Sequence, residues 1–229
     1  DVCSSDLITV EYSTAPGSGA IPGTDYLNVQ GIATVSAGAK TGVITVPILG
    51  DIMNEANELI FLNLTNASPS AVLTRTQTSG TIENDDPPPI VTVSADPILE
   101  GNSGLTSVLI RASLSAPSGR AVAVAYGTSN GTAVAPGDYR AKSGALAFAA
   151  GVTSNAITLQ IEGDRIVEGN EYFFINISNA VNSVASTNLV AITLIDDDFR
   201  FVAPGDPAAR SEEHTSELQS PCNLVCRLL

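Results

Sequence analysis

The stretch that decides the fold reads GDRIVEGNEYFFINISNA and occupies residues 163–180. An earlier stretch, GDIMNEANELIFLNLTNA at residues 50–67, follows the same pattern of apolar, acidic and amide side chains. Two further pairs of motifs keep this spacing to within one residue: residues 22–26 with 136–139, and residues 84–86 with 196–198. Several blocks in register indicate a duplicated domain of about 110 residues.

Each copy has the sequence pattern of β-strands. Apolar and polar residues alternate at residues 43–48 and again at residues 156–161, as expected for strands with one buried face. Asn130-Gly131 favours a two-residue hairpin, because both residues tolerate positive φ. Other strand-like runs are residues 91–93, 107–114, 121–126, 145–148, 171–177 and 190–195. Since no stretch shows helical periodicity, we expect an all-β chain of tandem immunoglobulin-like antiparallel β-sandwiches with about seven strands each.

The domain boundaries follow from the repeat and from one proline run. Residues 87–90, which contain three consecutive prolines, form a short stiff linker between a first repeat at 8–86 and a second at 91–198. Tyr12 corresponds to Tyr126, but only residues 8–11 precede it within the first repeat. We therefore expect the first repeat to lack its two opening strands and to expose unpaired sheet edges. Residues 199–209 are expected to begin a following element.

The two ends of the chain look foreign to the protein. Residues 1–7 and residues 210–216 can be encoded by reverse-complementary DNA strands, GAC GTG TGC TCT TCC GAT CT and AGA TCG GAA GAG CAC ACG TC. This string resembles a short-read sequencing adapter, so residues 1–7 and 210–229 are interpreted as translated library sequence rather than natural tails. All three cysteines and the single histidine lie there, at Cys3, Cys222, Cys226 and His214. A zinc or redox role for them is therefore set aside.

Composition excludes several classes of function. The 229 residues include 24 acidic and 10 basic side chains, for a net charge of −14, which disfavours binding to nucleic acid or to anionic membranes. No run of about 18 apolar residues exists, so no membrane insertion is expected. Residues 8–209 contain no His, Cys or Trp, which excludes a Ser-His-Asp or Cys-His arrangement and leaves no tryptophan platform for sugars. We expect a protein that is not an enzyme.

The chain resembles the Calx-beta family in several spaced motifs. Glu100-Gly101 matches the early Glu-Gly of the family, and Pro136-Gly137-Asp138-Tyr139 corresponds to its Gly-x-Asp-Tyr element. The hairpin motif at 126–133, the acidic block at 164–173 and the closing run at 196–198 agree as well. The resemblance implies a seven-stranded antiparallel sandwich that holds Ca²⁺ in loops at one end. Such domains occur in the calcium-sensing region of sodium–calcium exchangers, in an integrin subunit and in large bacterial surface proteins.

By this resemblance, carboxylates at one end of each repeat are the expected Ca²⁺ ligands. In the second repeat they are Glu100, Asp138, Asp164, Glu168, Glu171, Asp196, Asp197 and Asp198. A weaker site in the first repeat would use Asp25, Asp51, Glu55, Glu58, Asp85 and Asp86. Two departures matter: Gly163 stands where many calcium-binding members carry an Asp, and Asn84 replaces the first Asp of the closing run. The alternative interpretation is that these acids populate solvated turns.

These features favour a calcium-binding structural or adhesive module of a larger extracellular or cell-surface repeat protein, with a role in cell communication. Its partners would be neighbouring repeats of the same chain, together with an unidentified protein or glycan. Two alternatives remain open: a spacer that needs no metal, and a calcium-sensing domain of a membrane transporter.

Overall fold

The structure, a computed structural model, describes residues 7–198. The adapter-like ends, except for Leu7, and the expected start of a following element at 199–209 lie outside this range. Residues 7–198 form thirteen β-strands, which confirms the predicted all-β class. Within these residues no helix is long and apolar enough to cross a membrane.

The second repeat is a two-layered β-sandwich. One sheet has the order β10-β7-β5-β12 and the other has the order β6-β13-β11-β8-β9. Seven of these strands have five or more residues, which agrees with the expected count. The strands of this repeat are β5 (Ile90–Ser94), β6 (Ile98–Leu99), β7 (Gly104–Leu114), β8 (Val122–Asn130), β9 (Ser143–Phe148), β10 (Ser154–Gly163), β11 (Glu171–Val181), β12 (Val184–Ala185) and β13 (Leu189–Ile195).

Alternation along these strands builds the core of the second repeat. Ile157, Leu159 and Ile161 on β10 are at most 2% exposed, whereas the residues between them face solvent. From the other sheet, Phe173 on β11 stacks on Tyr139 with ring centroids 4.1 Å apart. Burial of aliphatic and aromatic side chains between two sheets is the main source of stability in such a sandwich.

The first repeat has only one regular sheet among the described residues. Its order is β2-β1-β3-β4, formed by β1 (Ile8–Pro16), β2 (Gln30–Val35), β3 (Glu58–Thr65) and β4 (Gln77–Ile82). Its buried apolar cluster consists of Ala20, Tyr26 and Ile60, with Val46 and Ile82 packed against it. Within residues 7–198 this cluster therefore packs against one regular sheet, whereas the core of the second repeat lies between two.

Two local predictions are wrong. Residues 43–48 do not form a strand, because their only bridge is between Ile48 and Tyr26 and no strand runs beside them within residues 7–198. Asn130-Gly131 is not a hairpin turn, since β8 pairs with β9 across the intervening residues 131–142. Gly131 is required instead by its neighbour, because a Cβ there would overlap the backbone and ring of Tyr172.

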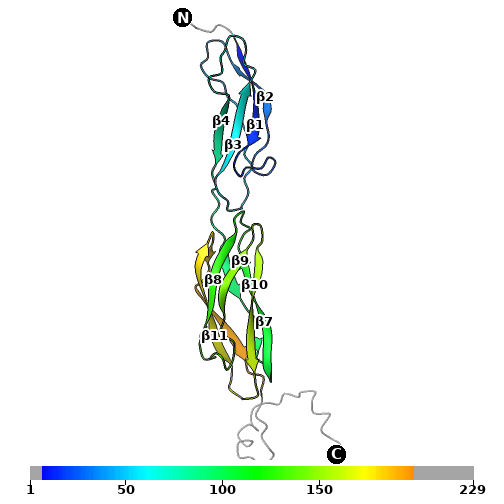
Figure 1. Ribbon diagram of the computed structural model, residues 1–229, viewed down its shortest axis with the longest axis vertical. Coiled ribbons are helices and arrows are strands. Elements are labelled where there is room, and N and C mark those ends of the chain that lie inside the picture. The colour runs from blue at the N-terminus through cyan, green and yellow to red at the C-terminus, as the bar shows by residue number, and fades with distance from the viewer. Residues whose placement is uncertain (1–6, 199–229) are drawn as a thin grey trace, which may run out of the picture.

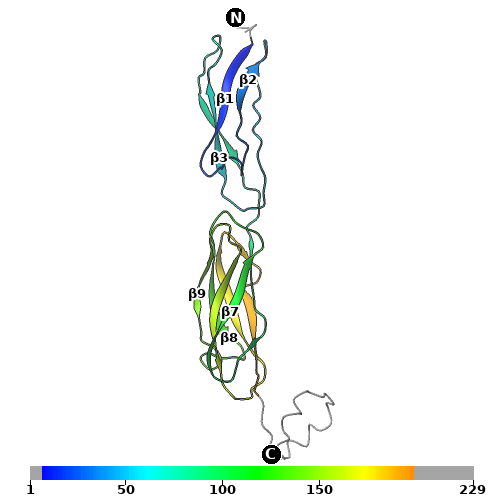
Figure 2. The same ribbon diagram turned by 90° about the vertical axis from the view of Figure 1, so that its right-hand side faces the viewer.

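The two repeats lie end to end, with a short connection between them (Figures 1 and 2). At the junction, the carbonyl of Asn54 accepts hydrogen bonds from the Ser118 hydroxyl (3.1 Å) and the Gly119 N–H (3.2 Å). Asn54 is 7% exposed and Ser118 is 2% exposed. The loop at residues 51–57 of the first repeat therefore packs against the loop at residues 115–121 of the second.

Candidate metal centres

Strand pairing brings the first acidic cluster of the second repeat together. The short strand β6 runs parallel to β13, with Leu99 opposite Ile195, so both strands end at the same edge. The residues that follow them are therefore neighbours, and the Glu100 N–H donates to the Ile195 carbonyl (3.1 Å). Glu100, Asp196 and Asp198 each offer a carboxylate oxygen within 4.8 Å of the others. We call these three residues cluster A.

Asp196 and Asp197 hold the surrounding loops in place. Asp196 accepts three backbone N–H bonds, from Glu168 (2.9 Å), Gly169 (2.7 Å) and Asp198 (2.9 Å). Asp197 accepts a bond from the Gly101 N–H (3.0 Å), so its carboxylate braces the Glu100 loop and is not part of cluster A. Of the three aspartates expected as ligands in the closing run, Asp196 and Asp198 therefore lie in cluster A, and Asp197 holds the neighbouring loop.

Glu100 is the least exposed acid of the second repeat and has an unusual environment. Its side chain is 7% exposed, and its Oε1 atom has no hydrogen-bond partner among the described residues. Burial, followed by the nearby charges of Asp196, Asp164 and Glu168, raises the pKa of Glu100 to about 7. The Oδ2 atom of Asp198 is likewise buried without a partner in residues 7–198. Cluster A thus contains two buried carboxylate oxygens that nothing described satisfies.

The pKa values of the two aspartates of cluster A are shifted in opposite directions. Backbone hydrogen bonds, chiefly from Gly169, lower the pKa of Asp196. Burial, followed by the charges of Asp196 and Asp197, raises the pKa of Asp198. Asp196 is therefore stabilised as an anion, whereas ionisation of Glu100 and Asp198 is disfavoured. A cation bound here would relieve the repulsion between the three carboxylates.

A second acidic cluster lies at the same end of the second repeat. Asp138, Glu168 and Glu171 each present a carboxylate oxygen within 4.8 Å of the others, and we call them cluster B. They come from the β8–β9 loop, the β10–β11 loop and the first residue of β11. Asp138 is fixed by a bond from the Val134 N–H (2.6 Å) to its Oδ2 atom. Burial, then the charge of Asp138, raises the pKa of both glutamates.

Asp164 lies between the two clusters. Its Oδ1 atom accepts a bond from the Ile166 N–H (2.7 Å), which closes the turn after β10. Its charge raises the pKa of Glu100 and of Glu168, so it acts on both groups. All eight acids predicted in the second repeat therefore gather at one end of the sandwich, with six in the two clusters and Asp164 and Asp197 beside them.

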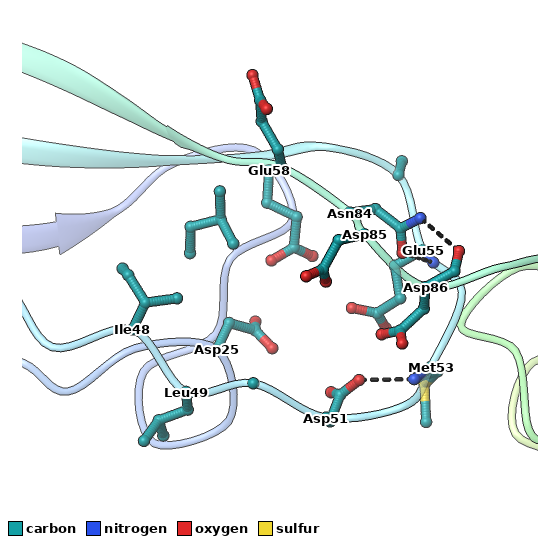
Figure 3. A pocket seen from close by; sticks show the side chains of 14 residues that line it. Asp25, Ile48, Leu49, Asp51, Met53, Glu55, Glu58, Asn84, Asp85 and Asp86 are labelled. Carbon is teal, nitrogen blue, oxygen red and sulfur yellow. Dashed lines mark hydrogen bonds between the residues drawn. The ribbon is translucent and has the colours of Figure 1, made fainter.

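The first repeat has one such cluster. Asp25, Asp51 and Glu55 each bring a carboxylate oxygen within 4.8 Å of the others, and we call them cluster C. Together with Glu58, Asp85 and Asp86 they line a cavity of about 210 Å³. Figure 3 shows the side chains of Asp25, Asp51 and Asp85 turned toward this common space. All six acids predicted in the first repeat therefore surround one cavity.

Burial and like charge act in cluster C as they do in the second repeat. Burial, followed by the charges of Asp25 and Glu55 and a hydrogen bond to Asp25, raises the pKa of Glu58 to about 7. Burial, then the charges of Asp25 and Asp51, also raises the pKa of Glu55. No glutamate equivalent to Glu100 lies within the described part of this repeat, because its opening strands are not there.

Asn84 keeps the structural role of Asp196 without its charge. Its Oδ1 atom accepts the Glu55 N–H (2.8 Å), as Asp196 accepts the N–H of Glu168. The Asn84 amide also donates to the Asp86 carbonyl (2.9 Å). The replacement therefore preserves the loop connection and removes one negative charge from the site.

Two asparagines that the sequence analysis missed secure this connection. Asn57 Oδ1 accepts the Asn84 N–H (3.1 Å), and Asn170 Oδ1 accepts the Asp196 N–H (3.3 Å). Asn57 and Asn170 occupy equivalent positions in the repeated stretches at 50–67 and 163–180. This repetition was the sequence signal that could have identified them as structurally important. They connect the acidic block of each repeat to its closing run.

Gly163 has a steric reason to replace an aspartate. A Cβ at this position would overlap the carbonyl oxygens of Glu100 and Gly101. The close approach of the Glu100 loop therefore requires glycine. At the equivalent Gly50, a Cβ would meet no atom within 4 Å, since no such loop lies there.

No basic side chain among residues 7–198 forms an ion pair with an acid of the clusters, and only the charge of Arg165 partly offsets the raised pKa of one of them, Asp198. The two ion pairs among residues 7–198 join Arg111 to Asp96 and Arg140 to Glu162, and neither acid belongs to a cluster. With no His or Cys in residues 8–209, the available donors are oxygens. Oxygen donors in an irregular arrangement suit a hard divalent cation such as Ca²⁺, and the two unsatisfied oxygens of cluster A fit that cation.

Comparison with known proteins agrees with the duplication. The profile of a family described as Calx-beta domain matches residues 4–87 and again residues 83–198. No curated protein is significantly similar in sequence to the chain.

The chain is also similar to several solved structures, at low sequence identity. The crystal structure of the apo-form Calx CBD1 domain is 22% identical, with 48% of this chain and 98% of that chain covered and a TM-score of 0.43. The crystal structure of CBD12 from CALX1.2 is 18% identical, with coverages of 84% and 88% and a TM-score of 0.40. The calcium binding domain CBD12 of CALX1.1 is 20% identical, with coverages of 77% and 68% and a TM-score of 0.35.

Proposed function

Because the two profile matches together span most of the sequence, the chain belongs to the Calx-beta domain family, and we propose that it is a calcium-binding module. Its second repeat would hold Ca²⁺ through cluster A and cluster B, and its first repeat would hold Ca²⁺ more weakly through cluster C. The cation would neutralise converging carboxylates and thereby stabilise the loops that carry them.

One observation carries this proposal: the two buried, unpartnered oxygens of Glu100 and Asp198 in cluster A. A buried polar atom without a partner costs free energy, and a buried charge costs more. A cation between these oxygens would remove both costs. Solvated turns, the alternative origin of these acids, leave carboxylates in water and do not leave them buried and unsatisfied.

The donor set favours Ca²⁺ over Mg²⁺. Ca²⁺ accepts six to eight oxygens in irregular arrangements, whereas Mg²⁺ demands compact octahedral geometry and retains several waters. Clusters A and B together supply six carboxylates from four separate segments of the chain, and the charge of Asp164 acts on both clusters. A protein site built from so many carboxylates suits the larger ion.

We place the module in an extracellular or cell-surface protein, as a structural or adhesive unit without enzymatic activity. Three features support this role: the end-to-end repeats (Figure 1), the net charge of −14, and the lack of His and Cys in residues 8–209. Cluster C lies beside the junction, since Glu55 follows Asn54, which binds Ser118 and Gly119 of the second repeat. Calcium at cluster C would therefore stiffen the connection between repeats.

Thermal unfolding of the full chain in EDTA, in millimolar Ca²⁺ and in millimolar Mg²⁺ tests the proposal. Ca²⁺ at 100 times its dissociation constant should stabilise the folded state by about 2.7 kcal/mol, and Mg²⁺ should do less. The double variant Glu168→Ala, Glu171→Ala, which loses two of the three ligands of cluster B, should lose much of this gain. An unfolding midpoint that does not respond to Ca²⁺ would exclude the proposal and leave a spacer that needs no metal.

A further inference from the structure

Asn130, at the end of β8, is hydrogen bonded to the loop that carries Asp138. Its Oδ1 atom accepts two bonds from that loop, one from the Ala135 N–H (3.1 Å) and one from the Tyr139 hydroxyl (2.7 Å). Asp138 lies between these two donors in the sequence and is one of the three acids of cluster B. A single side-chain oxygen therefore holds the loop on both sides of a candidate ligand.

The bond to Tyr139 also connects Asp138 with Glu171, another acid of cluster B. The Tyr139 ring stacks on Phe173 with ring centroids 4.1 Å apart, and neither side chain is more than 1% exposed. Phe173 lies opposite Asn130 in the pairing of β11 with β8. Asp138 directly precedes Tyr139. Glu171 is two residues before Phe173, so the stacked rings fix the segments that carry the two carboxylates, and Asn130 holds the hydroxyl end of the stack.

A glycine that both repeats require aligns them at this position. A Cβ at Gly131 would lie 2.4 Å from the Tyr172 carbonyl oxygen. In the first repeat, a Cβ at Gly17 would lie 2.4 Å from the Leu59 carbonyl oxygen. Because Leu59 and Tyr172 are equivalent in the two repeated stretches, the two glycines are equivalent as well. Pro16, which precedes Gly17, therefore takes the place of the asparagine in the first repeat.

Without the asparagine, the tyrosine of the first repeat has no partner. Tyr26, the counterpart of Tyr139, is fully buried, and its hydroxyl makes no hydrogen bond among residues 7–198. The proline side chain at position 16 has no acceptor to offer it. Among the described residues, the bond to the tyrosine hydroxyl is therefore confined to the second repeat, for which we propose the stronger calcium sites.

We propose that Asn130 is a positioning residue for cluster B: by accepting its two bonds, it holds the Asp138 carboxylate where Ca²⁺ can bind it together with the two glutamates. This inference rests on the proposed function, because it requires that cluster B binds Ca²⁺. Asn130 is not one of the acids and acts through the loop. The Asp138 carbonyl also accepts the Glu162 N–H (2.9 Å), so loss of the Asn130 bonds should shift the loop without unfolding it. Loss of a group that orients a metal ligand weakens metal binding by roughly 10- to 100-fold.

The test compares Asn130→Ala with Asn130→Asp in the full chain. The alanine variant loses the acceptor, whereas the aspartate variant keeps a side-chain oxygen there. In an NMR titration with Ca²⁺, the backbone amides of Val134 and Asp138 report on cluster B, and the amide of Asp198 reports on cluster A. We expect Asn130→Ala to weaken Ca²⁺ binding at cluster B about tenfold and to change binding at cluster A far less. Asn130→Asp should bind Ca²⁺ at least as tightly as the parent chain.

Asn176→Ala is the matched control for a general loss of stability. Asn176 Nδ2 donates to the Gly127 carbonyl (3.2 Å) and to the Ser129 hydroxyl (2.8 Å). This variant therefore also removes two hydrogen bonds of an asparagine from the paired strands β8 and β11, but none to the loop at 131–139. It should lower the unfolding midpoint and leave the Ca²⁺ affinity of cluster B unchanged.

A measurement in EDTA tests the loop without any metal. The Val134 N–H donates to Asp138 Oδ2 (2.6 Å), and its hydrogen exchange should become about tenfold faster in Asn130→Ala, because two bonds that hold the loop are lost. It should not change in Asn176→Ala. Tyr139→Phe removes one of the two bonds and keeps the ring stack, so it should weaken Ca²⁺ binding at cluster B about threefold. It tests the same contact if Asn130→Ala does not fold.

The failures of the two proposals can be told apart. If Ca²⁺ does not shift the Val134 and Asp138 amides in the parent chain, cluster B is not a calcium site, and both proposals are overturned there. If the parent chain binds Ca²⁺ and Asn130→Ala binds it equally well, only the positioning role is overturned. Unchanged exchange at Val134, equal weakening by Asn176→Ala, or binding by Asn130→Asp as weak as that by Asn130→Ala would overturn it too.

Discussion

The two repeats share their acidic loops and differ in what covers them. In both, an aspartate accepts the N–H four residues before it: Asp25 from Ile21 (2.5 Å) and Asp138 from Val134 (2.6 Å). In both, a second aspartate closes a turn by accepting the N–H of the residue two positions later. In the first repeat the Asp51 carboxylate accepts the Met53 N–H (2.6 Å), and in the second the Asp164 carboxylate accepts the Ile166 N–H (2.7 Å). These bonds are local, so the loops keep their shape in a repeat whose second sheet is absent from residues 7–198.

The two repeats differ in how many apolar residues they bury. The second has nineteen buried apolar residues in one cluster, and the first has three. The acid that the first repeat lacks is the counterpart of Glu100, the residue with the buried, unpartnered oxygen. Loop geometry therefore depends on nearby hydrogen bonds, whereas domain stability and cluster A depend on strands that are distant in sequence.

The largest difference is expected from matched isoleucines in the two repeats. Ile161→Ala removes a fully buried side chain and should destabilise the second repeat by about 4 kcal/mol. Ile48→Ala removes a side chain that is 50% exposed and should cost about 1 kcal/mol or less in the first repeat. Urea unfolding followed by circular dichroism, with hydrogen exchange to assign each transition, measures both. Equal costs would show that the first repeat has a covered face in solution.

Aspartate at the two equivalent glycines should have opposite effects. Gly163→Asp forces a side chain against the Glu100 and Gly101 carbonyls and should destabilise the second repeat by about 3 kcal/mol. Gly50→Asp meets open space next to Asp51, so it should leave the fold intact and strengthen Ca²⁺ binding at cluster C severalfold. Thermal unfolding and calcium titration check the pair. A stable Gly163→Asp variant would contradict the steric account of this departure from the family pattern.

The metal-free chain should lose stability as pH rises. Glu58 and Glu100 have a pKa of about 7 in the folded chain, mainly because of burial. A carboxyl group whose pKa is raised by folding binds protons more tightly when folded, so its contribution is complete below pH 4.5 and is lost as pH rises through about 7. In EDTA, stability should fall by about 2 kcal/mol from pH 5 to pH 8. The lowered pKa of Asp196 does not change this trend, because that group titrates only below its ordinary pKa of 3.8.

Calcium should reverse this pH dependence, because protons compete with Ca²⁺ for the same carboxylates. The unfolding midpoint in EDTA and in Ca²⁺, measured between pH 5 and pH 8, gives both trends. A metal-free midpoint that increases steadily over this range would contradict the account of the buried glutamates.

The smallest effect is expected from exchanging the first residue of the closing run. Asn84→Asp keeps the acceptor for the Glu55 N–H and loses the donor to the Asp86 carbonyl, so it should cost about 1 kcal/mol in EDTA. It should also raise the Ca²⁺ affinity of cluster C, because it adds a charge. The reciprocal change Asp196→Asn should lower the affinity of cluster A. Calcium titrations of the two variants check the pair, and affinity changes of the same sign would contradict the equivalence of Asn84 and Asp196.

The sequence predicted what is local or repeated. The matching motifs at 50–67 and 163–180 predicted the duplication, and the alternation of apolar and polar residues predicted strands of the second repeat. The gathering of acids at one end was implied by the resemblance to the Calx-beta family. The sequence did not distinguish the candidate ligands from the acids that hold the loops in place. Asp197 belongs to the second kind because its carboxylate accepts the Gly101 N–H, a contact between residues distant in sequence. The sequence also misplaced a strand at 43–48, since strand formation needs a partner that the alternation of one segment cannot reveal.

Contacts between distant residues explain the remaining differences. Asn130-Gly131 has the composition of a tight turn, yet Asn130 Oδ1 accepts the Tyr139 hydroxyl (2.7 Å) and orders a longer loop. The need for glycine at position 163 arises from a backbone 62 residues earlier, at Gly101. Neither contact leaves a signal in the local sequence.

Calorimetric titration of Ca²⁺ into the full chain and its Glu100→Gln variant tests the central claim most directly. Asp96→Asn is the matched control, because it removes one charge from an exposed acid that pairs with Arg111 outside the clusters. We predict that Glu100→Gln weakens Ca²⁺ binding by the second repeat at least about tenfold, since it removes a buried charged ligand, and that Asp96→Asn binds as the parent chain does. Equal Ca²⁺ affinity in all three proteins, or no binding by the parent chain, would contradict the assignment of cluster A as a calcium site.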